Sequence, residues 1–151
     1  MESENLDVRP EISFVLGASG SFHPDYVTRV LDIQPTVARK QGDRVGKAGE
    51  TKVRFDTWNV YSPKTRGYEF VNYLLDFLRM FEGKEEKLKS LSADDSITFY
   101  LTAYVSTFHG MQRPGIRLEK TLVEKIMKFG FIMDIVIYCE CCDEEDGEDN
   151  G

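Results

Sequence analysis

Apolar residues that recur at every second position predict three strands in this chain. They are Ile12, Phe14, Leu16 and Ala18; Ile97, Phe99, Leu101, Ala103 and Val105; and Phe131, Met133, Ile135, Ile137 and Cys139. In the second of these strands, threonine and tyrosine occupy the intervening positions Thr98, Tyr100, Thr102 and Tyr104. Such a polar and aromatic second face is typical of a sheet that is covered on one side only.

A fourth strand is predicted at about 53–61, but its alternation changes phase along the way. Val53 and Phe55 fall on one face, whereas Trp58 and Val60 fall on the other. This change indicates either a bulge or a strand that is buried on both faces.

Apolar residues at three- and four-residue spacing predict the helices. His23-Pro24-Asp25 begins the first helix, because proline suits the first helical position and Asp25 complements the positive end of the helix dipole. That helix ends before Pro35, since a residue preceding proline avoids the helical conformation. The other helices are predicted at 67–81, with a break or kink at Gly83 and a short continuation at 85–91, and at about 119–129, ending at Gly130. Residues 36–52 are predicted to be a loop, and Ile116 and Leu118 a short extended piece.

This order of elements predicts one α+β domain. We expect a sandwich in which helices pack on one face of a mixed or antiparallel sheet, of broadly ferredoxin-like character. The chain of 151 residues has the usual length of a single domain. We expect a flexible arm at 1–10, the folded domain at 11–141 and a disordered acidic tail at 142–151.

The chain carries a net charge of −7, from 26 acidic and 19 basic residues. This balance argues against nucleic-acid binding, which requires a basic surface, and it favours a basic protein partner. Part of the acidity lies in the tail, where six acids fall between Asp143 and Asp149. No apolar run approaches the ~18 residues that span a membrane, and the polar start of the chain does not resemble a signal peptide. We therefore expect a cytoplasmic protein without a membrane segment.

The three cysteines, Cys139, Cys141 and Cys142, are crowded near one end and are odd in number. They do not form a disulfide framework, and they fit a reducing compartment. A structural zinc site needs four ligands, often as two separated pairs, and this chain has no second cysteine pair. We therefore interpret the cysteines as core or strand-end residues and expect neither a metal nor a cofactor.

No catalytic residues can be assigned from the sequence. His23 is interpreted as the N-cap of the first helix, although it has the chemistry of a general base. His109 follows the third strand in a turn, and the pair Asp94-Asp95 lies in a polar connection. We expect all four residues to be structural or solvated.

Two groups of residues are candidates for binding. The first is the basic segment from Arg39 to Arg54, in which Arg39, Lys40 and Arg44 have the chemistry to receive a phosphate or an acidic partner segment. Its glycines do not match a phosphate-binding loop, and an ordinary solvated loop is the simpler interpretation. Trp58 lies nearby in sequence and is either a core residue or a ligand platform. The second group is the pair Tyr100 and Tyr104, because tyrosine is enriched at protein interfaces.

Several of these segments resemble a bacterial family called domain of unknown function 4279. The family reads phenylalanine, a short polar residue, proline and aspartate, then a helix and Ile-x-Pro-Thr. The matching segments are Phe22-His23-Pro24-Asp25, Ile33-Gln34-Pro35-Thr36, Arg39-Lys40-Gln41-Gly42-Asp43, Trp58, Leu74-Leu75 and Gly130-Phe131-Ile132-Met133-Asp134-Ile135. The chain departs from the pattern at His23, where the family prefers aspartate or asparagine. The resemblance covers about 12–139, and it implies a fold outline but no catalytic residues.

Our leading hypothesis is a non-enzymatic binding protein that uses the face of Tyr100 and Tyr104. Some members of the family are suspected immunity proteins, so the resemblance implies a protein that occludes a toxin. The alternative is a small-molecule or anion sensor that uses Arg39, Lys40, Arg44 and Trp58. A third hypothesis, an unrecognised enzyme, requires a histidine or carboxylate with a shifted pKa inside a cleft.

Overall fold

The computed structural model describes residues 9–108 and 110–140, and six of its strands form one mixed sheet. The strands stand in the order β2-β5-β1-β7-β8, and β6 also pairs with β1. All neighbours are antiparallel except β7 and β8, which are parallel. The strands are β1 (Glu11–Gly20), β2 (Val37–Arg39), β5 (Asp56–Tyr61), β6 (Thr65–Arg66), β7 (Ile97–Phe108) and β8 (Ile132–Glu140).

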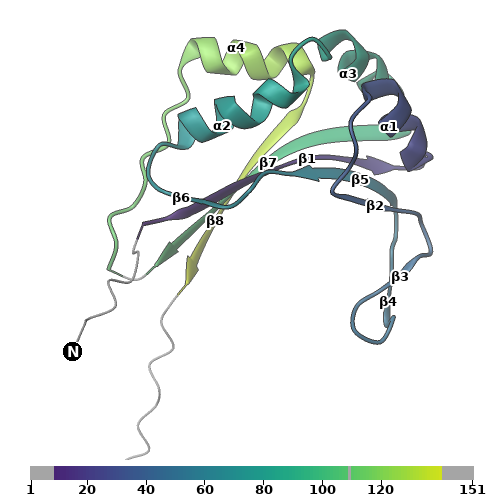
Figure 1. The fold of residues 1–151 in the computed structure, drawn as a ribbon, viewed down its shortest axis with the longest axis horizontal. Helices are drawn as coiled ribbons and strands as arrows, with labels where there is room; N and C mark the ends of the chain where they lie inside the picture. The colour runs from purple at the N-terminus through teal and green to yellow at the C-terminus, as the bar shows by residue number, and fades with distance from the viewer. Residues whose placement is uncertain (1–8, 109, 141–151) are drawn as a thin grey trace, which may run out of the picture.

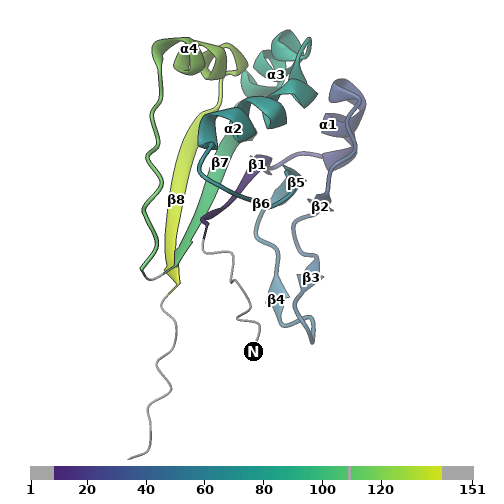
Figure 2. The ribbon, with the colours of Figure 1, turned by 60° about the vertical axis from the view of Figure 1, so that its left-hand side comes forward.

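Four helices lie on the same face of this sheet (Figures 1 and 2). They are α1 (Pro24–Leu31), α2 (Phe70–Leu78), which continues into a 3-10 turn at Arg79–Phe81, α3 (Glu85–Ser92) and α4 (Lys120–Phe129). Nδ1 of His23 accepts a hydrogen bond from the backbone N–H of Asp25 at 3.3 Å, which confirms the N-cap of α1. Gly130 ends α4 in the left-handed conformation, with φ of 73°, as the sequence predicted.

The core lies between the helices and the sheet. Alternate residues of β1, β5 and β7 point toward the helices and are buried; they are Ile12, Phe14, Leu16, Ala18, Trp58, Val60, Ile97, Phe99, Leu101, Ala103 and Val105. Phe14 packs edge-on against Phe70 at 5.4 Å and stacks on Phe77 at 5.9 Å, which joins β1 to α2. The alternation that predicted β1 and β7 is thereby confirmed.

The prediction of a loop at 36–52 is wrong. This segment contains β2 and a hairpin of two short strands, β3 (Arg44–Val45) and β4 (Thr51–Lys52), which projects from the sheet as an arm (Figure 1). Strands of two or three residues are too short to show a period, so the sequence pattern could not reveal them.

The phase change at 53–61 marks the end of this arm and is neither a bulge nor a strand buried on both faces. The exposed Phe55 precedes β5, whereas Trp58 and Val60 lie within β5 and are buried. No strand forms at 110–119, so the extended piece predicted at Ile116 and Leu118 is not a part of the sheet described here.

The α+β class and the helices on one face are confirmed, but the strand order does not show a ferredoxin-like topology. In the split βαβ arrangement the two central strands are parallel. Here β1 and β7 are antiparallel, and the single parallel pair lies at the edge of the sheet. Apart from residues 9 and 10, the predicted arm at 1–10 and the tail at 142–151 lie outside the described residues.

Candidate functional site

The face of the sheet opposite the helices, here called the open face, carries a cluster of four tyrosines. No described helix covers it (Figure 2). Tyr61 comes from β5, Tyr100 and Tyr104 from β7 and Tyr138 from β8. The strand register brings them together, because Tyr61 pairs with Val15, which in turn pairs with Thr102, between the two tyrosines of β7. Tyr138 lies opposite Ser106 on the neighbouring parallel strand.

The ring of Tyr100 lies over a glycine of the neighbouring strand β1. Gly17 is its partner on β1, and a Cβ built at Gly17 would lie 2.3 Å from Cζ of Tyr100. The absence of a side chain at this position lets the ring lie close to β1 and reach β5, where its hydroxyl donates a hydrogen bond to Oδ1 of Asn59 at 3.0 Å. Tyr100 is therefore half-buried and held in one orientation, which reduces the entropy it would lose on contact with a partner.

Tyr104 and Tyr138 form a stack at the other end of the cluster. Their ring centroids are 6.3 Å apart and their planes differ by 12°. Tyr138 is 51% exposed, so its ring packs against that of Tyr104 and still remains accessible to a partner on the open face.

Burial raises the pKa of Tyr100 and of Tyr104 above the ordinary tyrosine value. Repulsion from neighbouring negative groups adds to this rise in pKa. Tyr104 and Tyr61 act on Tyr100, and Tyr138, Tyr61 and the carboxylate of Asp134 act on Tyr104. Both hydroxyls therefore stay protonated at neutral pH and remain hydrogen-bond donors.

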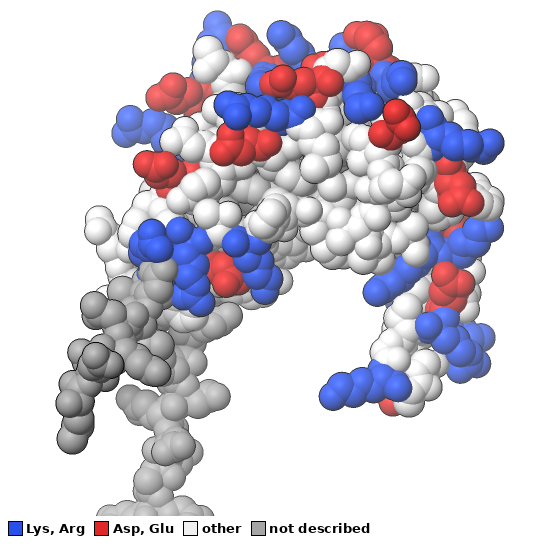
Figure 3. Space-filling view, in the orientation of Figure 1, with Lys and Arg blue, Asp and Glu red and all other residues white. Residues whose placement is uncertain are grey.

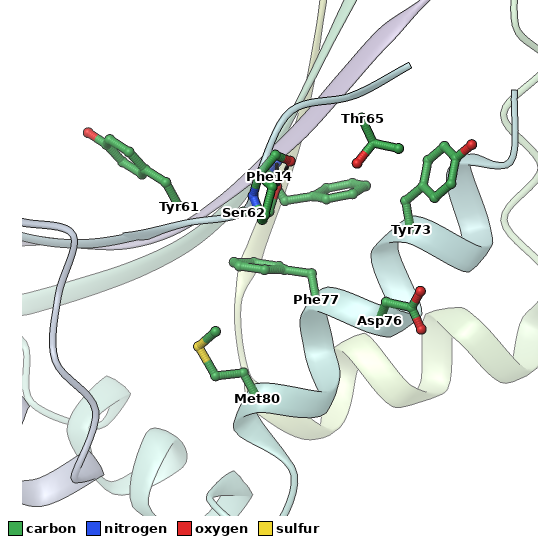
Figure 4. A pocket seen from close by; sticks show the side chains of 9 residues that line it. Phe14, Tyr61, Ser62, Thr65, Tyr73, Asp76, Phe77 and Met80 are labelled. Carbon is green, nitrogen blue, oxygen red and sulfur yellow. Dashed lines mark hydrogen bonds between the residues drawn. The ribbon is translucent and has the colours of Figure 1, made fainter. Parts of the chain in front are cut away.

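A hollow of about 410 Å³ opens on the open face beside this stack. Its lining residues are Glu11, Ser13, Phe14, Val15, Tyr61, Ser62, Lys64, Tyr104, Ser106 and Tyr138. A second hollow of about 280 Å³ lies between the β5–β6 connection and α2, and Figure 4 shows the rings of Phe14 and Phe77 within it. Oγ of Ser62 accepts a hydrogen bond from the N–H of Phe14 at 2.8 Å and so fixes the segment that separates the two hollows.

Basic side chains flank the open face on two sides. Figure 3 shows uncharged residues beneath the sheet, with lysines and arginines on the arm at one side and near the start of β1 at the other. At the second place, Nζ of Lys64 lies 3.4 Å and the guanidinium of Arg66 3.9 Å from the carboxylate of Glu11, and Arg66 also covers the ring of Phe108. All 19 basic residues of the chain lie within the described part, whereas nine of the 26 acidic residues do not. The described surface is therefore not acidic, in contrast to the chain as a whole.

The structure places the residues of the predicted basic site at the base of the arm. Arg39 and Lys40 line a small hollow of about 140 Å³ together with His23, Asp25 and Asp43. Oδ2 of Asp43 accepts a hydrogen bond from the N–H of Lys40 at 2.8 Å. Arg44 does not line this hollow, and its guanidinium donates to the carbonyl of Gly49 at 3.2 Å.

Trp58 is not brought together with these basic side chains. It is fully buried on the helix side of the sheet, and its Nε1–H donates to Oγ1 of Thr28 in α1 at 3.0 Å. The interpretation of Trp58 as a core residue is confirmed, and its inclusion in the predicted binding site is wrong, because its burial leaves no surface for a ligand.

The remaining candidates for chemistry do not converge in the described structure. Oδ1 of Asp94 accepts hydrogen bonds from the hydroxyl and the N–H of Ser96, which lower the pKa of this carboxyl. Cys139 is exposed, and Cys141, Cys142 and His109 lie outside the described residues. Within residues 9–108 and 110–140, no three histidine, cysteine or acidic side chains are grouped as a metal site requires. No helix in the same ranges is long and apolar enough to cross a membrane.

Sequence reasoning identified half of the tyrosine cluster. Tyr100 and Tyr104 followed from the strict alternation in β7, but Tyr61 and Tyr138 were missed. Tyr61 is the last residue of a strand with an irregular pattern. Tyr138 lies between two of the apolar positions that predicted the last strand, and only that apolar face was considered. Asn59 was also missed, because its contact with Tyr100 depends on a pairing of β1 with β5 that one sequence does not reveal.

Comparison with known families supplies the identity of the domain. The family described as domain of unknown function DUF4279 matches residues 10–140, which is most of the chain. The chain belongs to the DUF4279 family. The matched range coincides with the described sheet and helices, so the resemblance predicted from the sequence is confirmed. No curated protein and no solved structure matches the chain.

Proposed function

We propose that this DUF4279 domain is a non-enzymatic binding protein that contacts a protein partner through the open face of its sheet. The observation that supports the proposal is the cluster of Tyr61, Tyr100, Tyr104 and Tyr138 on a face that no described helix covers. Tyrosine offers a large apolar ring and a hydrogen-bonding hydroxyl, and it loses little conformational entropy on binding.

The charges around the open face favour a partner with acidic groups at its edges. The net charge of the whole chain predicted a basic partner, and Asp134 lies on the open face near Tyr104, but the basic side chains of the arm and of the Lys64–Arg66 corner flank that face on two sides. Charged groups at the rim of an interface mainly guide association and orientation, whereas buried aromatic residues supply affinity. In this proposal the tyrosines therefore supply the affinity for the partner, and the lysines and arginines orient the partner as it approaches.

The most specific form of the proposal is a cytoplasmic immunity protein that neutralises a toxin. Occlusion of a toxin requires a rigid, complementary surface and no catalytic group. The hydrogen bond of Tyr100 to Asn59 and the stack of Tyr104 on Tyr138 give the open face that rigidity.

Affinity capture from the lysate of the protein's own host tests the proposal. The tagged protein is compared with a Tyr104→Ala/Tyr138→Ala variant and with a control, Tyr26→Ala/Tyr68→Ala. The control tyrosines are 45% and 42% exposed and do not belong to the open face. We expect one stoichiometric protein partner, retained by the control and lost by the open-face variant, which forfeits about 2 kcal/mol or more of binding free energy.

Equal capture by both variants would contradict the open face as the binding surface. If the captured partner is a toxin, producing it alone should arrest growth of the host. The wild-type protein and the control variant should relieve this arrest, and the open-face variant should not.

Anion sensing is the second candidate, favoured by the small hollow that Arg39 and Lys40 share with His23. The carboxylates of Asp25 and Asp43 line the same hollow and oppose an anion there, so this candidate is the weaker one. A thermal-shift screen with phosphate, sulfate and nucleotides tests it. Stabilisation that disappears in Arg39→Gln but persists in Arg79→Gln, a control at an exposed arginine of the 3-10 turn, would favour it.

A further inference from the structure

Strand β8 is an edge strand with an unusual exposure of apolar residues. It is nine residues long and pairs with β7 on one side only. In the described part of the chain, no backbone hydrogen bond joins its outer side to another segment. Asp134 is the single charged residue between Ile132 and Cys139. A long, apolar edge of this kind is a template for pairing with another strand.

Exposed apolar side chains gather around this edge. Twelve large hydrophobic residues are exposed in the described structure, and seven of them fall within residues 118–138. These seven are Leu118, Val123, Met127, Ile132, Ile135, Ile137 and Tyr138. Ile137 is 62% and Met127 69% exposed. Ile135 and Ile137 lie on the apolar face of the strand that the sequence predicted, and they remain exposed because no described strand pairs with the outer side of β8.

Helix α4 contributes to the same surface. Nζ of Lys125 lies 3.2 Å from Oε1 of Glu82, which shows that this flank of α4 faces the neighbouring helical segments. Because successive residues of a helix are about 100° apart, Val123 and Met127 lie on the opposite flank. They therefore point toward the same side of the molecule as the outer edge of β8.

The opposite edge of the sheet is short and charged. It is formed by β2, which has three residues, of which Ala38 and the charged Arg39 are exposed. The charged arm of β3 and β4 follows directly. Short strands and charges are the usual protection of an edge against pairing, and β8 is long and carries a single charged residue, Asp134, between Ile132 and Cys139.

We propose that the β8 edge is a dimer interface, in which β8 pairs antiparallel with β8 of a second copy and α4 packs beside α4 of that copy. A two-fold axis perpendicular to the sheet uses the same patch on both subunits, which is the commonest form of symmetric assembly. The two six-stranded sheets join into one, and both helix layers lie on the same side.

The sequence of β8 is self-complementary in the register centred on Val136. Side chains opposite each other in an antiparallel pair lie on the same face of the sheet. This register places Ile135 opposite Ile137 of the second copy on the helix side and Asp134 opposite Tyr138 on the open side. A register centred on Asp134 would instead bring two carboxylates together, and like charges directly opposite are destabilising. The charge pattern thus disfavours the register centred on Asp134 and is compatible with the one centred on Val136.

This dimer extends the open face without depending on the function proposed for that face. The two open faces lie on the same side of the joined sheet, so the tyrosine clusters of both copies meet at the seam. The dimer would form equally if the open face bound no partner, and its test measures only the association of the chain with itself.

Light scattering during size-exclusion chromatography tests the proposal at micromolar concentration. We expect twice the chain mass of 17.3 kDa for the wild-type protein. Ile137→Lys should give the monomer mass, because it places a charge in the middle of the seam. The control is Phe55→Lys in the arm, where the side chain is 60% exposed, and it should remain dimeric. Both variants should retain the circular dichroism of the wild type, since neither residue is buried.

A monomeric wild-type protein, or a dimer that persists in Ile137→Lys, would overturn the proposal. The register is tested by cysteine cross-linking in a background where Cys139, Cys141 and Cys142 are serine. Val136→Cys should form an intermolecular disulfide under mild oxidation, because opposite Cα atoms in an antiparallel pair lie about 4.5–5.5 Å apart. Phe55→Cys in the same background should remain reduced. Failure of Val136→Cys to cross-link a dimeric protein would overturn the antiparallel arrangement.

Discussion

The two faces of the sheet have opposite chemistry although the same strands build both. The helix side of β7 carries Ile97, Phe99, Leu101, Ala103 and Val105, all buried. Its open side carries Thr98, Tyr100, Thr102, Tyr104 and Ser106, of which Tyr100 donates a hydrogen bond to Asn59 and Thr102 is buried. The helix side supplies apolar burial and therefore stability. The open side is fixed by a few specific contacts, which suits it for recognition.

Truncation of the tryptophan on the helix side should have the largest effect on stability. Trp58→Ala removes a fully buried indole and its hydrogen bond to Thr28, and we expect a loss of about 3–5 kcal/mol in the free energy of unfolding. Urea denaturation followed by circular dichroism measures it. The matched change on the open face, Tyr138→Ala, should lose less than about 1 kcal/mol. Similar losses for both would show that the two faces do not differ in this way.

A side chain at Gly17 should have the next largest effect, because this glycine makes room for Tyr100. In Gly17→Ala the new Cβ would approach Cζ of Tyr100 to 2.3 Å, so the ring must move and its bond to Asn59 breaks. We expect a loss of about 1–3 kcal/mol. Ser19→Ala, on the same face of β1, is the control.

A double-mutant cycle sharpens this prediction. If the ring of Tyr100 is what Gly17 accommodates, Gly17→Ala should cost much less in a Tyr100→Ala background. If the two losses in unfolding free energy are strictly additive, the destabilisation by Gly17→Ala does not arise from a clash with the ring of Tyr100.

Removal of a single hydroxyl from the open face should have a smaller effect. Tyr100→Phe keeps the ring over Gly17 but loses the 3.0 Å hydrogen bond to Asn59. We expect a decrease of about 0.5–1.5 kcal/mol in the free energy of unfolding. An unchanged stability would indicate that the bond is replaced by water.

The smallest effect is the pH dependence at alkaline pH. The pKa of Tyr100 is raised in the folded protein, above the 10.0 of an unperturbed tyrosine, so the folded state favours the neutral phenol. The stability that this preference contributes is fully present below the pKa of Tyr100 in the unfolded chain. It is lost as the pH rises through the pKa of Tyr100 in the folded protein. Between about pH 9 and about pH 11, Tyr100→Phe should therefore lose less stability than the wild type. A parallel decline in both proteins would contradict the raised pKa.

The sequence predicted the faces of individual strands much better than the arrangement of strands. Alternation in β7 placed Tyr100 and Tyr104 opposite the core because side-chain direction follows the backbone period. In the last strand, alternation placed Ile135 and Ile137 on one apolar face, but it could not predict that they are exposed, because coverage depends on which elements lie beside β8. The arm at 44–52 escaped prediction because its strands have two residues each. Tyr61 and Tyr138 joined the cluster only through strand pairing, which one sequence does not encode locally.

The position of Trp58 has a consequence for spectroscopy. It is the only tryptophan of the chain, and it lies on the helix side, whereas four of the seven tyrosines form the cluster on the other side. Fluorescence excited selectively in the indole therefore reports the integrity of the core and remains insensitive to contacts on the open face. Tyrosine emission, and its transfer to the indole through the sheet, responds to those contacts. The indole and the clustered tyrosines thus report on opposite faces of the sheet, so intrinsic fluorescence can separate unfolding of the core from the contact proposed for the open face.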